Sequence, residues 1–451
     1  MERENFGSRL GFLLISAGCA IGIGNVWKFP YITGQNGGGA FVLVYLLFLA
    51  ILGVPVMTME FAMGRASQKS PVRMYQVLAP KKKVWHVHGY VALIGCVILM
   101  MFYTTVAGWM LQYFVLSATG KYEGMDTEAI GGLFNDVLAN PTTEVAYMAI
   151  IVVLGFFVIS RGLQKGLENV SKVMMLALLA IMVILAINSC FLKGGTEGLS
   201  FYLLPDFSRM MEIGIGNVAV AAMNQAFFTL SLGVGAMAIF GSYIGKNRSL
   251  TGESVQVALL DTFVAIVSGL IIFPACFAYG VEPGAGPGLI FITLPNIFNH
   301  MPLGRLWGSL FFVFMTFAAF STVLAVFECI LACVMDMWGM SRGKASFVCC
   351  IAILILSLPC ALGYNVLSGF APMGAGSTVL DLEDFIVSNL LLPIGSLIFV
   401  LFCVLRYGWG WDNFLKEANQ GKGLKMAGFL RPYMTVVLPL IILGILYLGL
   451  R

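Results

Sequence analysis

The sequence is poor in charged residues and in histidine. Only 11% of its 451 residues are Asp, Glu, Lys or Arg, and only three are histidines. Because soluble domains carry about 25% charged residues, a chain with so little charge cannot provide a water-exposed surface over its whole length. The composition therefore excludes a soluble globular protein and predicts that most of the chain lies in a lipid bilayer.

The sequence also lacks the patterns that carry enzymatic chemistry. It contains no hydrolytic triad, phosphate-binding loop or metal-binding motif. Cys329 and Cys333 would share one face of a helix, but two thiols with no third ligand near them indicate packing rather than a metal site. The acidic residues Asp261, Glu60 and Glu328 lie in apolar segments without an accompanying histidine. An enzyme is therefore not expected.

Long apolar segments occupy nearly the whole chain instead. A helix needs about 20 apolar residues to cross the hydrocarbon of a bilayer. Eleven segments meet this requirement: 8–34, 39–63, 86–119, 144–160, 167–191, 215–244, 254–280, 304–338, 345–362, 383–405 and 433–450. They leave no room for a soluble domain. The prediction is a single all-α transmembrane domain over 1–451 with about 11 transmembrane helices.

The basic residues are distributed unevenly between the two sides of these segments. With the N-terminus placed in the cytoplasm, 20 of them fall on the inner side and five on the outer side, and Lys28 lies within the first segment. Cytoplasmic loops of membrane proteins carry such an excess. We therefore expect a multi-pass protein of the cell membrane with its N-terminus inside and its C-terminus outside. The basic stretch KKKVWH then faces anionic lipid, and no nucleic-acid partner is expected.

The first and sixth segments are interrupted in the middle by glycines, in GCAIGIGN (18–25) and TLSLGVG (229–235). Each glycine destabilises a helix by about 1 kcal/mol relative to alanine. Unwound backbone is tolerated at membrane depth only where protein buries it or it lines a cavity. Two interruptions five spans apart are typical of a five-plus-five inverted repeat in secondary transporters. We predict repeats over approximately 8–191 and 215–405 and an extra helix at 433–450.

A broken helix offers binding groups that an intact helix does not. The half-helix after the break exposes N–H groups that attract a carboxylate, and the half-helix before it exposes carbonyl oxygens that suit Na⁺ or an ammonium group. Close packing of helices would also explain the glycines, but not the neighbouring Asn25, Thr229 and Ser231. We interpret the breaks as a substrate and ion site.

Five stretches resemble the neurotransmitter:sodium symporter family, and they follow in the family's order: AIGIGNVWKFPYITGQNGGGAFVLVYL, FYTTVAGWML, FFTLSLGVGAM, AAFST and DLEDF. The sequence is most similar to bacterial members with eleven helices. The resemblance implies a sodium-dependent symporter of neutral, hydrophobic or aromatic amino acids that works by alternating access.

The resemblance also implies two sodium sites built from oxygen ligands, as an alkali cation requires. The first would be completed by the substrate carboxylate and formed by Ala20, Asn25, Thr229 and Asp261. The second would be formed by the carbonyl oxygens of Gly18, Ile21 and Ala318 and the hydroxyls of Ser321 and Thr322.

A substrate site between the two breaks follows from the same resemblance. The substrate carboxylate would bind the amides of Ile23 and Gly24 and the Tyr103 hydroxyl. The ammonium would bind the carbonyl oxygens of Ala20, Phe228 and Thr229 and the Ser231 hydroxyl. The substrate side chain would meet Leu99, Tyr103, Phe228, Val234, Thr322 and Val326. Relatives that carry amines without a carboxylate have aspartate at the position of Gly22, so this substrate should supply its own carboxylate.

Two gates are implied on either side of that site. Toward the outside, Lys28 would pair with Asp384, and an intramembrane lysine is costly unless it is paired. Toward the cytoplasm, Arg3 would pair with Asp336, close to Tyr243.

Transport without chloride is a further implication. Chloride-dependent relatives hold an anion beside the first sodium site, partly with a serine, whereas this chain has Ala265 there. Asp261 stands where the family usually has Asn, so a fixed carboxylate replaces the mobile anion. Tyr45 matches another member of the anion site.

Some alternatives remain open. Proton coupling is the nearest one, because Asp261 and Glu60 could carry protons. A ligand-gated channel would need a span with a regular polar stripe, which the sequence lacks. The expected partners are the amino-acid substrate and the lipid bilayer, with the chain acting as a monomer or a homodimer.

Overall fold

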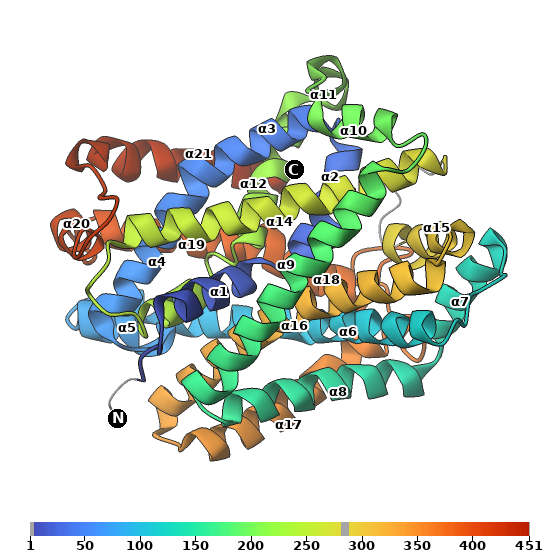
Figure 1. Cartoon of the computed structure of the whole chain (residues 1–451). Coiled ribbons are helices and arrows are strands. Elements are labelled where there is room, and N and C mark those ends of the chain that lie inside the picture. The colour runs from blue at the N-terminus through green and yellow to red at the C-terminus, as the bar shows by residue number, and fades with distance from the viewer. Residues whose placement is uncertain (1–3, 281–287, 451) are drawn as a thin grey trace.

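The protein is described by a computed structural model that covers residues 4–280 and 288–450. The described chain is almost entirely helical and contains no β-strand (Figure 1). The predicted all-α class is therefore confirmed.

Nine helical segments in the described residues are long and apolar enough to cross a membrane. Some combine an α-helix with a short π or 3-10 turn. They are α3–η2–α4 (Gly39–Ser67), η3–α6 (Lys83–Ala118), α8 (Pro141–Ser160), η4–α9 (Leu163–Cys190), α14 (Leu250–Ala278), α16 (Gly304–Trp338), α17 (Arg342–Ala361), α18–η6–α19 (Val379–Val404) and η7–η8–α21 (Gly428–Gly449).

Two of the predicted segments, the first and the sixth, are broken, as the glycines predict. The first consists of α1 (Arg9–Ala20) and the pair η1–α2 (Gly24–Gln35), which bend by 53° at the break. The sixth consists of α12 (Ile215–Thr229) and α13 (Ala236–Gly241). Between α12 and α13, Ser231, Gly233 and Gly235 have φ angles of 51°, 90° and 77°. This left-handed conformation cannot continue a helix and favours glycine.

Short helices close the two ends of the bundle (Figure 1). At the end that carries the N-terminus lie α5 (Pro71–Leu78) and α20 (Trp411–Ala418). Nearer the opposite end lie α7 (Thr127–Ala139), α10 (Thr196–Leu203), α11 (Phe207–Ile213) and α15 (Leu294–His300).

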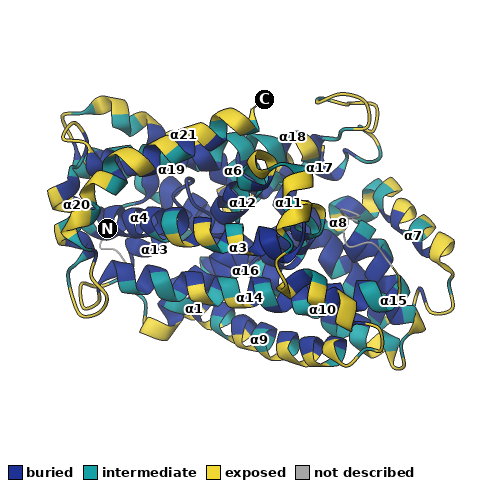
Figure 2. Ribbon diagram, turned by 90° about the horizontal axis from the view of Figure 1, so that it is seen from above, coloured by how far each residue is buried: buried dark blue, intermediate teal, exposed yellow. Residues whose placement is uncertain are grey.

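The buried residues gather at the centre of the bundle, around α16, α6 and the two broken spans (Figure 2). The peripheral helices expose large apolar side chains, such as Phe157 on α8, Leu176 on α9 and Leu443 on α21. An apolar outer surface is what contact with lipid requires, because lipid tails cannot solvate polar groups. The two breaks thus lie inside the protein, where unwound backbone is protected from lipid.

Candidate functional site

The two breaks face each other and are held together by polar contacts. The side-chain amide of Gln225, on α12, donates a hydrogen bond to the carbonyl oxygen of Gly24 (2.8 Å). The hydroxyl of Ser231 donates to the carbonyl oxygen of Cys19 (3.1 Å). The buried carboxylate of Glu60 accepts a bond from the N–H of Gly233 (2.6 Å). These bonds satisfy backbone groups that the helices leave unpaired at the breaks.

Five oxygen atoms converge where α16 passes the first break. The Ser321 hydroxyl lies 2.9 Å from the carbonyl oxygen of Ala318, 3.0 Å from that of Gly18 and 3.3 Å from that of Ile21. The Thr322 hydroxyl lies 3.2 Å from the same Gly18 oxygen. A hydroxyl has a single hydrogen and cannot donate to three acceptors at once. An oxygen-only cluster with too few hydrogens fits a small hard cation such as Na⁺.

These five residues are the ones expected at the second sodium site, and the structure brings all of them together. They come from the end of α1, the break itself and the middle of α16. Ser321 and Thr322 are both buried. The donor set therefore fits a sodium ion.

A second polar cluster surrounds the carboxylate of Asp261, on α14, which is fully buried. Asn25 donates to it at 2.8 Å, Thr229 at 3.1 Å and Tyr45 at 3.3 Å. All three donors are neutral, and no basic side chain pairs with Asp261 among the described residues. An anionic group with only neutral donors can balance a cation. The predicted first sodium set meets here, with Ala20 in the adjoining cavity.

That cavity lies between the two breaks. It has a volume of about 10 Å³ in this structure, which leaves room for no more than one water molecule. The Tyr103 hydroxyl accepts a hydrogen bond from the N–H of Ile23 (2.8 Å). Two of the three groups expected to bind a substrate carboxylate are thus bonded to each other. At Gly22 an added Cβ would overlap the Tyr103 hydroxyl and Oγ1 of Thr322, so only glycine fits.

Most of the expected substrate-site residues line this cavity, namely Ala20, Gly22, Gly24, Leu99, Tyr103, Phe228, Ser231 and Thr322. The remaining four, Ile23, Thr229, Val234 and Val326, do not. Ile23 touches it only through the bond to Tyr103. Thr229 instead points to Asp261, because its hydroxyl is hydrogen-bonded there.

Val234 packs elsewhere, and two lining residues were missed. Cγ1 of Val234 lies against Gly95 on α6, and Val234 does not line the cavity. Its carbonyl oxygen accepts a hydrogen bond from the Cys96 thiol. Cys19 and Leu392 line the cavity without having been predicted. Cys19 stands between two predicted residues of the first break, which is a signal the sequence offers. Leu392 comes from the tenth span, and only the folded arrangement places it here.

The ion pair expected at the outer gate is present. The Lys28 ammonium lies 2.9 and 3.1 Å from the two carboxylate oxygens of Asp384 and 3.0 Å from the Ser388 hydroxyl. It also lies 4.1 Å from the ring centroid of Phe228, a cation–π contact. Phe228 and Tyr103 line both the inner cavity and a second cavity of about 220 Å³ that includes this ion pair. The two rings therefore separate the cavities.

The inner gate is described only in part, because Arg3 lies outside the described residues. The carboxylate of Asp336 accepts a bond from the N–H of Ser70 (2.8 Å). The hydroxyl of Tyr243 donates to Glu328 (2.7 Å).

Glu328 belongs to an ion pair that the sequence analysis did not find. Both of its carboxylate oxygens bind the Arg342 guanidinium, at 2.7 and 2.8 Å. Glu4 approaches Arg342 at 3.7 Å, which brings the N-terminal segment to the same place. A fully buried carboxylate is costly unless it is paired or hydrogen-bonded, so its presence in an apolar segment was the available signal.

The expectation that no third thiol lies near Cys329 and Cys333 is wrong. Cys329 does have a third thiol nearby, because the sulfur of Cys96 lies 3.8 Å from its own. α6 and α16 pack closely along their length, and this contact brings the two cysteines together. No group of three or more His, Cys, Asp or Glu side chains able to hold a metal is found in the described part of the chain.

Comparisons with known proteins agree on one family. The model of the sodium:neurotransmitter symporter family matches residues 3–126 and 134–451. The chain is 36% identical to an uncharacterized sodium-dependent transporter, YhdH, of Bacillus subtilis, over 94% of this chain and 92% of that protein. It is 26% identical to the sodium-dependent serotonin transporter of Drosophila melanogaster, over 98% of this chain and 76% of that protein.

A solved structure extends this likeness to three dimensions. The crystal structure of MhsT in complex with L-phenylalanine matches with a TM-score of 0.90 and 37% sequence identity. The match covers 99% of this chain and all of that chain.

Proposed function

Because the chain belongs to the sodium:neurotransmitter symporter family, a family of membrane transporters and not of enzymes, we propose that it carries neutral amino acids with hydrophobic or aromatic side chains together with sodium. The observation that carries the proposal is the approach of the Ser321 hydroxyl to three carbonyl oxygens, with Thr322 beside it. Carbonyl oxygens of the first break meet hydroxyls of α16 here, and the cluster lies next to the cavity between the breaks.

The walls of the cavity favour a substrate with an uncharged side chain. Leu99, Phe228 and Leu392 are apolar, and none of the lining residues carries a charge that would pair with a charged substrate side chain. None of the residues that line the cavity, Gly22 included, supplies a carboxylate of its own. A zwitterion that brings its own carboxylate therefore suits the site better than an amine. The L-phenylalanine bound to MhsT has this chemistry.

The transport cycle is proposed to begin with sodium binding at the two oxygen clusters. Substrate then separates the Tyr103 hydroxyl from the Ile23 amide and binds both with its carboxylate, while its ammonium meets carbonyl oxygens at the breaks. The Lys28–Asp384 pair closes over it toward the outside. Opening of the Arg3–Asp336 contact and the neighbouring Glu328–Arg342 pair would release sodium and substrate inside.

Sidedness and assembly are part of the same proposal. The N-terminus lies in the cytoplasm and the C-terminus outside, because the basic residues concentrate on the inner side. The inverted repeats span approximately 8–191 and 215–405, and the helix at 433–450 lies outside them. The functional unit is a monomer or a homodimer, since the sites lie within one chain.

Uptake into proteoliposomes tests the proposal. Radiolabelled L-phenylalanine and a panel of neutral and charged amino acids are offered under an imposed sodium gradient, a proton gradient or neither. Accumulation of neutral amino acids should require the sodium gradient. If a proton gradient without sodium drives full uptake, the protein is a proton-coupled transporter and the assignment of the oxygen clusters is wrong.

A further inference from the structure

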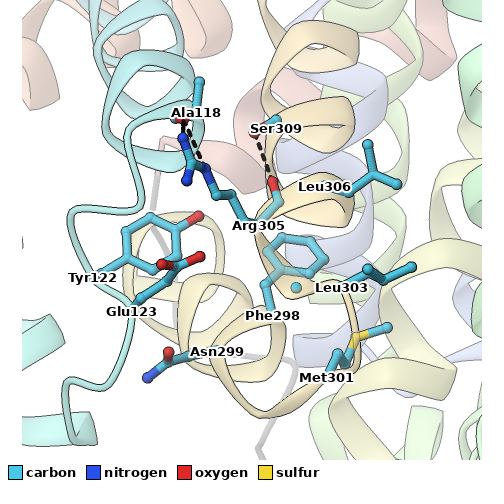
Figure 3. Close-up of a pocket in the computed structure, with 11 residues that line it drawn as sticks. Ala118, Tyr122, Glu123, Phe298, Asn299, Met301, Leu303, Arg305, Leu306 and Ser309 are labelled. Atoms are coloured by element: carbon cyan, nitrogen blue, oxygen red, sulfur yellow. Dashed lines mark hydrogen bonds between the residues drawn. The ribbon is translucent and has the colours of Figure 1, made fainter.

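A hollow of about 650 Å³ lies at the end of the molecule that carries α7 and α15, where α6 ends and α16 begins (Figure 3). It shares no lining residue with the two cavities along the transport path. Its walls combine an arginine, a glutamate and exposed apolar side chains. The transport cycle uses none of these groups.

Arg305 supplies the positive charge of this hollow. Its Nε and Nη2 both donate to the carbonyl oxygen of Ala118 at the end of α6, the former at 2.9 Å. These bonds fix the plane of the guanidinium, and Nη1 has no acceptor in the described part of the chain. Arg305 also stands in the first turn of α16, where the helix dipole adds positive potential. An oriented guanidinium at a helix start is suited to phosphate.

Glu123 supplies the negative charge, on a loop that is held in place on both sides. The preceding residue, Tyr122, is buried and donates through its hydroxyl to Ser117 (2.7 Å). The following residue, Gly124, donates through its N–H to Asn299 (2.9 Å), which also binds the carbonyl oxygen of Met125 (2.6 Å). Glu123 has no basic partner among the described residues, so its carboxylate is available to an ammonium group.

Apolar side chains border the same hollow. Leu303 is 71% exposed and Leu306 is 51% exposed. In Figure 3 they point away from the loop of Tyr122 and Glu123. Arg305 is the last charged residue before an uncharged run over 306–327. The hollow is therefore at the boundary between water and lipid.

We propose that this hollow binds a phospholipid whose headgroup carries a phosphate and a primary ammonium, as in phosphatidylethanolamine. The phosphate binds Arg305, the ammonium binds Glu123, and the acyl chains lie along Leu303 and Leu306. A soluble zwitterion has the same two charges but would leave both leucines exposed to water. Burial of their apolar surface favours the lipid.

The test is lipid binding to the full-length protein, measured by native mass spectrometry with lipids of identical acyl chains. Phosphatidylethanolamine should bind about tenfold more tightly than phosphatidylcholine, whose trimethylammonium cannot donate a hydrogen bond, and than phosphatidylglycerol, which has no ammonium. Glu123→Gln should remove this preference, whereas Arg305→Gln should weaken binding of all three lipids, because all three carry the phosphate. Arg209→Gln is the matched control, because Arg209 is an exposed arginine at the same end and is paired with Asp206.

Equal binding of the three lipids would overturn the proposal, as would an unchanged preference in Glu123→Gln, an exposed substitution that should not affect folding. Phosphoethanolamine and L-phenylalanine distinguish a soluble ligand from a lipid. If either binds as tightly as the phospholipid and loses binding in Arg305→Gln, the hollow recognises a free zwitterion and the assignment to lipid is wrong.

Discussion

The side-chain amide of Asn25 donates hydrogen bonds both to the carboxylate of Asp261, at 2.8 Å, and to the backbone carbonyl oxygen of the same residue, at 3.1 Å. The two residues are 236 positions apart and join the first break to the middle of α14. The bonds fix the carboxylate beside the cavity between the breaks. A fixed anion at this place bears directly on whether transport needs chloride.

We expect uptake by the wild-type protein to be unchanged when chloride is replaced by gluconate. Asp261 supplies one negative charge beside sodium, and Ala265, one turn further along α14, is buried and offers no hydroxyl to an anion. The double variant Asp261→Asn with Ala265→Ser should make uptake depend on chloride. Radiolabelled uptake in the two salts measures this.

Asp261→Asn alone is the control, and it should lose uptake in both salts. Strong chloride dependence of the wild type would contradict the prediction at once. A double variant that works equally well without chloride would show that Asp261 is not the compensating charge.

Removal of the hydroxyls at the second sodium cluster should weaken sodium binding. Ser321→Ala together with Thr322→Ala deletes two of the five oxygen ligands, and we expect the sodium concentration for half-maximal uptake to rise about tenfold or more. Thr316→Ala is the matched control, because Thr316 is on the same helix and its hydroxyl is hydrogen-bonded to the carbonyl oxygen of Phe312, one turn away. Unchanged sodium dependence in the double variant would exclude these hydroxyls from the site.

Substitution of Gly22 should separate the effect of size from that of charge. A Cβ would overlap Tyr103 and Thr322, so Gly22→Ala should already lower amino-acid affinity about tenfold or more. Gly22→Asp adds repulsion between two carboxylates in a dry site. Binding of L-phenylalanine and of its decarboxylated amine, measured by displacement, should therefore shift in favour of the amine in Gly22→Asp but not in Gly22→Ala. Normal amino-acid affinity in Gly22→Asp would place the substrate carboxylate elsewhere.

Loss of the outer ion pair should speed escape of bound substrate toward the outside. Lys28→Met removes both the pair with Asp384 and the contact with the Phe228 ring. The pair is partly exposed, so we expect only a severalfold faster dissociation, corresponding to about 1 kcal/mol. Release of pre-bound radiolabelled amino acid measures it, with the exposed Lys193→Met as control. An unchanged rate would show that the pair does not hold the gate closed.

The polar residues at the breaks could be recognised from the sequence, because polar side chains in apolar segments need partners, but most of those partners could not. A lysine at membrane depth predicts an acidic partner, and the family resemblance identified it as Asp384, which pairs with Lys28 in the structure. Asn25 and Thr229 were singled out because they lie beside the glycines of the breaks, whereas Ser321 and Thr322 followed from the resemblance. The partner of Glu328 was missed because Arg342 begins the next helix, and nothing in the spacing connects the two.

The sequence by itself determined the all-α class, the long apolar helices and the position of both breaks, because hydrophobic length and glycine are local properties. Only the tertiary structure decided which side chains face the cavity. The Val234 side chain packs against α6, and the Thr229 hydroxyl is hydrogen-bonded to Asp261. Cys19 and Leu392 line the cavity instead. The tertiary structure also places the Tyr103 hydroxyl within hydrogen-bond distance of the Ile23 N–H. These outcomes depend on how helices pack around unwound backbone, where the period of 3.6 residues no longer fixes the direction of a side chain.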